Sequence, residues 1–169
     1  FTRPNLAYTV EHVLGDRARL ERLAVLLDEL GLGRNAEAGR VVVYASSRRR
    51  VTDVGETLRK QGFLAGWYHA GRSDGARRRA AEAFDAGKHA VLVATSAFGM
   101  GIDVPDVRLV AHLQAPATLE GYTQQAGRAG RDGRDARCVL WFGPSDALLQ
   151  ARLRGTWPGA LAGWDALCS

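Results

Sequence analysis

The chain has 169 residues, of which 46% are hydrophobic and 24% are charged, a composition that fits one globular domain and excludes a disordered segment. Its formal net charge of +5, carried mostly by arginine, favours an anionic partner such as a nucleic acid or a nucleotide. No run approaches the roughly 20 apolar residues of a membrane span, and Cys138 and Cys168 form neither a disulfide framework nor a metal-binding motif, so an intracellular protein associated with DNA or nucleotide is expected.

The N-terminal half alternates between short apolar runs and a leucine repeat. Residues 6–12 and 41–45 are predicted strands, and leucines recur at helical spacing over residues 17–30 between them. Ser46 and Ser47 are suitable N-caps for a second helix, which reaches residue 60 and is stopped by a glycine. This half therefore predicts an amphipathic helix between two strands, followed by a capped helix.

The same alternation continues through the C-terminal half. Strands are predicted at residues 65–69, 90–94, 107–113 and 136–142, and helices at 73–84, 118–126 and about 145–153. Because strands and helices alternate, the sequence predicts an α/β fold with a mainly parallel central sheet covered on both faces. Ligands of such sheets bind at the carboxyl ends of the strands.

Polar motifs directly follow several predicted strands. Ser47 and Arg48 come after the second strand, His69 ends the third, and Thr95 and Asp103 bound the segment after the fourth. Hydroxyl groups and backbone amides at helix starts suit phosphodiester oxygens, and a carboxylate such as Asp103 can accept hydrogen bonds from a ribose. We expect these segments to line one surface at the carboxyl edge, although each fragment alone also fits an ordinary cap or turn.

A glycine-flanked arginine pair is the most informative motif. Residues 124–133 read QQAGRAGRDG and place Arg128 and Arg131 three positions apart. A guanidinium is planar and permanently charged, so it meets phosphate oxygens with paired hydrogen bonds, and a spacing of three places both arginines on one helical face. We expect the pair to complete a nucleotide pocket at the edge where the strands end. A solvated basic turn is the alternative for this stretch taken alone.

Together these segments resemble a known family. The strings FTRPNL, VVVYASSRRRV, YHAGR, VLVATSAFGMGIDVPDVRLV and EGYTQQAGRAGRDG are similar to the second RecA-like domain of RecQ-family DNA helicases. The resemblance spans nearly the whole chain. It implies a RecA-like three-layer α/β/α domain at residues 1–150 with a C-terminal extension at 151–169, which forms part of an ATP-driven motor that unwinds duplex DNA in the 3′ to 5′ direction.

The resemblance also implies roles for individual residues. Arg131 is similar to the arginine finger of the family, and Arg128 to its neighbour that senses the γ-phosphate. Gln124 corresponds to a position that couples nucleotide to DNA, and Gly101 and Asp103 to positions on the nucleotide side, with Asp103 near the ribose. Positions at which the family contacts or supports the DNA backbone correspond to Ser47, Arg48, His69 and Thr95.

The nucleotide cannot be held by this sequence alone. The chain contains no G-x-x-x-x-G-K-[ST] phosphate loop, and its acidic string at residues 28–29 falls on a predicted helix rather than after a buried strand. ATP and Mg²⁺ are therefore expected to be held mainly by a first RecA-like domain of the same protein. The expected nucleic-acid partners are single-stranded DNA and duplex junctions, and the isolated chain is expected to bind DNA weakly and to hydrolyse ATP negligibly.

Three positions depart from the family pattern, and other interpretations remain open. Thr123 and Gln125 stand where Tyr and Glu are usual, and Arg72 stands where Leu is usual after YHAG. A non-catalytic nucleic-acid-binding module would also explain the basic charge. A domain of a related RNA helicase is a further alternative, although those proteins usually carry His-Arg where this chain has Gln124 and Gln125. A dinucleotide-binding enzyme is disfavoured because the third glycine of G-x-G-x-x-G is absent.

Overall fold

The computed structural model describes residues 3–96, 103–144 and 146. Gly101, most of the helix expected near residues 145–153, and the extension at 151–169 lie outside the described residues. The ten elements in chain order are β1 (Leu6–His12), α1 (Asp16–Leu30), β2 (Arg40–Tyr44), α2 (Arg48–Lys60), β3 (Ala65–Tyr68), α3 (Asp74–Asp85), β4 (Val91–Ala94), β5 (Val107–His112), α4 (Leu119–Ala126) and β6 (Ala136–Phe142). Every element predicted within this part of the chain is present, and the predicted ends differ from the observed ones by at most one residue.

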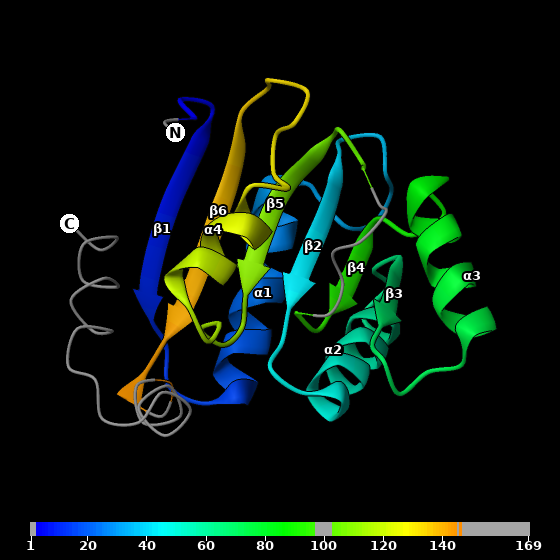
Figure 1. The fold of residues 1–169 in the computed structure, drawn as a ribbon, viewed down its shortest axis with the longest axis horizontal. Coiled ribbons are helices and arrows are strands. Elements are labelled where there is room, and N and C mark those ends of the chain that lie inside the picture. Colours follow the sequence, from blue (N-terminus) through cyan, green and yellow to red (C-terminus); the bar gives the residue numbers. More distant parts are fainter. Residues whose placement is uncertain (1–2, 97–102, 145, 147–169) are drawn as a thin grey trace.

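The strands form one six-stranded sheet in the order β1-β6-β5-β2-β4-β3. Every pairing is parallel, so all carboxyl ends lie at one edge, as the arrowheads in Figure 1 show. We call this the carboxyl edge and the opposite one the amino edge. β1 and β3 are the outer strands, each paired on one side only. The predicted parallel α/β architecture is confirmed.

Helices cover both faces of the sheet and create two cores. One face packs against α1 and α2, through a cluster that includes Leu23, Leu27, Val51, Leu58 and Val43. The other face packs against α3 and α4, through a cluster that includes Phe84, Tyr122, Ala126, Val42 and Leu140. The result is the expected three-layer α/β/α arrangement, and no helix among the described residues is long and apolar enough to cross a membrane.

A buried ion pair ties the first helix to the ends of three strands. Arg19 of α1 is 2% exposed, and its Nη2 lies 2.7 Å from Oδ2 of Asp146, which is 4% exposed. Arg19 also donates to the carbonyl of Val13 just after β1 and to that of Leu113 just after β5. The Asp146 carboxylate accepts from the backbone amides of Ala115 and Gly143. The pair therefore fixes the carboxyl edge from the inside.

Removal of the Asp146 carboxylate is expected to destabilise the fold strongly. Asp146→Ala leaves the Arg19 guanidinium buried without its counter-charge, which costs about 3–5 kcal/mol of unfolding free energy. Urea denaturation of the variant and the parent chain measures this difference. Glu21→Ala is the matched control, because Glu21 pairs with Arg17 on the exposed surface and such pairs contribute about 0.5 kcal/mol or less. An Asp146→Ala effect no larger than the control would contradict this account.

Candidate functional site

A pocket of about 670 Å³ opens at the carboxyl edge between the starts of α2 and α4. Ser47 caps α2 by accepting a hydrogen bond from the Arg50 amide at 3.2 Å, and Thr118 caps α4 by accepting from the Gly121 amide at 2.8 Å. Two helix N-termini therefore face one hollow, and the partial positive charge of such termini attracts anions. The pocket is suited to a phosphate group.

A polar network that the sequence did not reveal holds the rim of this pocket. Arg50 donates to Asp16 and to the hydroxyl of Ser46, both at 2.8 Å. Gln114 donates to the same Asp16 carboxylate at 3.1 Å and accepts from the Ser46 amide at 3.0 Å. Asp16 and Gln114 are 98 positions apart, so only the fold brings them together.

Arg48, His69 and Thr95 also lie at the carboxyl edge, as expected from the strand order. Arg48 is the first residue of α2 and is exposed, and the Thr95 amide follows β4 and donates to the carbonyl of Tyr68. A Cβ atom at Gly71 would lie 3.1 Å from Cδ of Arg48, which places the YHAGR loop beside that arginine. The predicted DNA-contact residues Ser47, Arg48, His69 and Thr95 thus follow strands β2, β3 and β4, which are neighbours in the sheet.

His69 acts as a neutral support for the loop that follows β3. Its Nδ1 accepts from the Gly71 amide at 3.1 Å, which leaves the proton on Nε2, 3.1 Å from the Thr52 hydroxyl. Burial lowers the pKa of His69, and the nearby charges of Arg72 and Arg48 lower it further. The imidazole is therefore uncharged at neutral pH and positions the loop rather than adding a positive charge.

The arginine pair lies in the segment that follows α4, and the charges of both arginines reach Tyr44 at the carboxyl end of β2. The α4 helix starts at the carboxyl edge, and the segment after it returns to the amino edge to begin β6 (Figure 1). There the Gly130 amide donates to the Val107 carbonyl, and the Asp132 amide to that of Pro105. Since a chain that joins parallel strands must travel back across the sheet, Arg128 and Arg131 lie over one face of it.

Arg131 and Asp103 contact each other on this face. Nη1 of Arg131 lies 2.6 Å from Oδ1 of Asp103, and the two side chains are 39% and 80% exposed. The residues are 28 positions apart, so their pairing supports the expectation that the two motifs share one surface. Neither residue lines the pocket between the starts of α2 and α4.

Beneath the arginines lies a buried aromatic cluster, which sequence reasoning missed. The His112 ring stacks on Tyr44 with centroids 5.0 Å apart and contacts Tyr122 at 4.8 Å. Nε2 of His112 lies 2.8 Å from Oε1 of Gln125. Burial raises the pKa of Tyr44 to about 12, against the lowering effect of the Arg128 charge. Arg128 therefore lies beside this cluster. Gln124, which belongs to α4 like Tyr122 and Gln125, is exposed.

The N-terminal RPN segment holds the arginine loop in shape. Arg3 donates to the carbonyls of Gly127 and Gly130 at 2.8 and 2.7 Å, and Asn5 donates to Gly130 at 2.9 Å. Gly130 has φ +56°, and a Cβ there would meet Asn5 Nδ2 at 2.5 Å. Only glycine fits this position. Arg3 and Asn5 thus position the loop that carries the two arginines.

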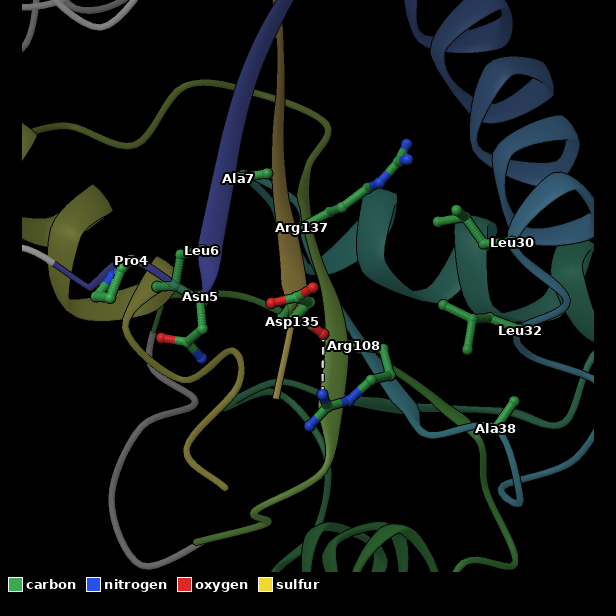
Figure 2. A pocket seen from close by; sticks show the side chains of 11 residues that line it. Pro4, Asn5, Leu6, Ala7, Leu30, Leu32, Ala38, Arg108, Asp135 and Arg137 are labelled. Carbon is green, nitrogen blue, oxygen red and sulfur yellow. Dashed lines mark hydrogen bonds between the residues drawn. The ribbon is translucent and has the colours of Figure 1, made fainter. Parts of the chain in front are cut away.

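A second hollow, of about 580 Å³, lies at the amino edge beside the starts of β1 and β6. Figure 2 shows Leu30 and Leu32 on one side and Asn5 on the other, with Arg108 donating to the carbonyl of Asp135 at 2.9 Å. None of the residues predicted for nucleotide or DNA lines it. This hollow therefore lies apart from the predicted site residues.

Comparisons with known proteins identify the family that the chain resembles. The family model described as the helicase conserved C-terminal domain matches residues 20–133. The ATP-dependent DNA helicase RecQ of Haemophilus influenzae is 39% identical over 146 residues, covering 86% of this chain and 22% of that protein. The protein of the same name from Bacillus subtilis is 40% identical over 150 residues, covering 89% and 24%. The chain thus spans about a quarter of the length of these relatives.

Solved structures show the same fold. The RNA helicase Prp28 from Chaetomium thermophilum, bound to ADP, superposes with a TM-score of 0.71 at 28% identity, covering 91% of this chain and 36% of that one. The yeast splicing factor Prp28 gives a TM-score of 0.75 at 19% identity, covering 90% and 32%, which shows the fold alone. The RecA-like architecture expected from the sequence is confirmed.

His112 is expected to make stability depend on pH. Burial lowers its pKa from 6.5 to about 4, although the Gln125 hydrogen bond raises it. Between those values the unfolded chain binds a proton that the folded chain does not, so stability falls as the pH falls from about 6.5 to 4, by up to about 3 kcal/mol. In urea denaturation across this range, His112→Phe should depend less steeply on pH than the parent. Equal pH dependence would contradict this role.

Proposed function

The chain belongs to the helicase conserved C-terminal domain family, and from that premise we propose that it is the second motor domain of an ATP-dependent DNA helicase that unwinds duplex DNA in the 3′ to 5′ direction. The sequence similarity to proteins named as ATP-dependent DNA helicases supports the choice of DNA. The observation that carries the proposal is an exposed Arg131 paired with Asp103 on an open face. An arginine finger has to be accessible to a nucleotide held by another domain.

The chain offers residues that fit a nucleotide from one side. Arg131 would act as the finger on the phosphates, and Arg128 would sense the γ-phosphate from its place beside Tyr44. Asp103 is exposed and has the oxygen acceptors that suit ribose hydroxyls. Gly101, expected on the same side, lies outside the described residues. Charge stabilisation and positioning supply most of the rate in phosphoryl transfer, and these side chains would provide both.

The other side of the nucleotide would come from a first RecA-like domain. The sequence contains no phosphate loop, and such a loop supplies the amides, the lysine and the hydroxyl that hold phosphates and Mg²⁺. Bound ATP with Mg²⁺ would supply the phosphoryl group whose hydrolysis drives movement. In this arrangement the arginines of this chain would stabilise the negative charge of the phosphates, and the first domain would hold the nucleotide and Mg²⁺.

Single-stranded DNA would cross the carboxyl edge. Ser47 and Arg48 begin α2 there, Thr95 follows β4, and neutral His69 keeps the YHAGR loop beside Arg48. Helix N-termini and hydroxyls bind phosphates regardless of base, so recognition would be independent of sequence and weakened by salt. Duplex junctions are the expected substrates of the complete motor.

The α4 helix would connect the two surfaces. Its first residues border the pocket at the carboxyl edge, and the loop after its last residue carries Arg128 and Arg131. Gln125 is anchored on His112, so α4 is fixed to β5 from inside. Gln124, which is exposed on the same helix, would couple nucleotide to DNA. A small shift of this helix would be felt at both sites.

Loss of the proposed finger is expected to abolish hydrolysis while leaving DNA binding intact. In a protein that joins this chain to a phosphate-loop domain, Arg131→Ala should lower DNA-stimulated kcat by about 10³ to 10⁵. Steady-state ATPase assays measure the effect. Arg134→Ala is the matched control, because Arg134 is exposed on the same loop and should retain the parent rate. A non-catalytic binding module would show no dependence on Arg131, and that outcome would favour the rival interpretation.

The 169-residue chain alone is expected to bind DNA weakly and to hydrolyse ATP negligibly. Binding of single-stranded DNA should weaken as salt rises, and Arg48→Ala should reduce the slope of log K against log salt by about 0.7, the value for one phosphate contact. Fluorescence anisotropy at several salt concentrations provides the slope. Robust ATP turnover by the purified chain, or an unchanged slope for Arg48→Ala, would count against the respective part of the proposal.

A further inference from the structure

A small basic pocket lies at the free edge of β3 and shares no lining residue with the pocket between α2 and α4. It has a volume of about 230 Å³ and is lined by three arginines from different elements, Arg59 at the end of α2, Arg72 after β3 and Arg79 on α3, together with Trp67 and His89. No carboxylate lines this pocket. Three guanidinium groups that converge without an acid form an anion site by their charge alone.

Two of the arginines are held in place by the outer strand. Arg59 donates from Nε and Nη2 to the carbonyl of Ala65 at 3.1 and 2.8 Å, and Arg72 donates from Nη1 to the carbonyl of Trp67 at 2.5 Å. Their guanidinium carbons lie 4.5 and 5.3 Å from the centroid of the Trp67 ring, within reach of cation–π attraction. The outer strand thus presents two fixed cations to the pocket.

The remaining donors of the cluster have no protein partner within the described part of the chain. There, neither Nη1 of Arg59 nor Nε and Nη2 of Arg72 makes a hydrogen bond, and Arg79 makes no side-chain hydrogen bond or ion pair. By contrast, Arg77 on the same helix as Arg79 pairs with Asp74. Arg59 and Arg72 could serve only to cap the carbonyls at the free edge of β3. That role would not explain why Arg79, which binds no carbonyl, lines the same pocket.

The accumulated charge is uncompensated. Burial lowers the pKa of Arg72, and the nearby charges of Arg59 and Arg79 lower it further. Burial and the charges of Arg59 and Arg72 likewise lower the pKa of His89, which keeps this ring neutral. Each like-charge neighbour disfavours the ionised form. An anion in the pocket would relieve this repulsion and use the free N–H groups.

We propose that this pocket binds a backbone phosphate of the nucleic-acid strand that crosses the carboxyl edge. The pocket continues that edge without a gap in sequence, since Gly71 packs beside Arg48 and the next residue, Arg72, lines the pocket. The Arg72 amide donates to the His69 carbonyl at 3.1 Å, and Arg48 and Arg72 are both near enough to His69 for their charges to lower its pKa. The inference rests on the proposed DNA binding and extends its track around the free edge of β3.

The test compares salt dependence among matched variants of the 169-residue chain. The ligand is a labelled oligothymidylate of roughly 16 nucleotides, the upper end of the usual length for one single-strand binding domain. Arg72→Leu combined with Arg79→Ala should lower the slope of log K against log salt by about 0.7 to 1.4, because one or two phosphate contacts are lost. Arg78→Ala, which removes one exposed charge of α3 outside the pocket, should leave the slope unchanged.

A direct readout identifies what enters the pocket. The indole N–H resonance of Trp67, assigned with Trp67→Phe, should shift when the oligothymidylate is added, and the shift should be lost in the double variant. Inorganic phosphate is the second probe. A shift with inorganic phosphate but none with the oligonucleotide would show a site for a small free anion and would overturn the nucleic-acid assignment. If the double variant unfolds, the single variant Arg79→Ala replaces it in both measurements. The Arg79 side chain makes no hydrogen bond or ion pair within the described part of the chain, so its loss should leave the fold intact.

The remaining outcomes separate this inference from the function on which it rests. If Arg48→Ala lowers the slope while the double variant and the Trp67 resonance stay unchanged, the pocket proposal is overturned and DNA binding at the carboxyl edge stands. If the double variant lowers the slope while Arg48→Ala does not, the pocket is supported and the carboxyl-edge track fails. Absence of any oligothymidylate binding by the parent chain would overturn both.

Discussion

The buried pair of Arg19 and Asp146 ties together the carboxyl ends of three strands, β1, β5 and β6. Burial of two charges is costly, and it is tolerated here because each charge is satisfied by several hydrogen bonds. Those bonds join the first helix to the residues after β1, β5 and β6. The chain that leaves β5 begins from this fixed point and leads into α4, so the position of the helix between the two proposed surfaces depends on an interaction at neither of them.

The sequence predicted the alternating elements well because its local signals agree with the fold. Continuous apolar runs such as residues 91–94 become buried parallel strands, and Ser47 caps a helix as its type and position indicate. The path of the segment that carries the arginines follows from the topology of the sheet. Arg128 and Arg131 follow the end of a helix, and a helix that leaves the carboxyl edge ends nearer the amino edge. The spacing of the motif does not indicate where this segment runs, whereas the predicted order of strands and helices does.

Several residues that sequence reasoning missed have a partner far along the chain. Arg3 reaches Gly130 across 127 positions, and Arg19 reaches Asp146 across the same number. His112 and Gln125 are only 13 apart, but nothing in their local pattern shows that both are buried. Their contact also explains one departure from the family pattern. A neutral imidazole is well matched by the amide of Gln125, whereas a glutamate there would bring an extra charge into the core.

The contact between Arg131 and Asp103 has a consequence for how a motor of this kind can cycle. Without a counter-ion, the Arg131 guanidinium would be repelled by the other cations of its loop and would bind anions from the solution. Here the Asp103 carboxylate pairs with the Arg131 guanidinium. In the proposed motor, closure of two lobes would exchange this carboxylate for a phosphate group. Such an exchange would cost little in either direction and would leave the lobes free to separate again after each turnover.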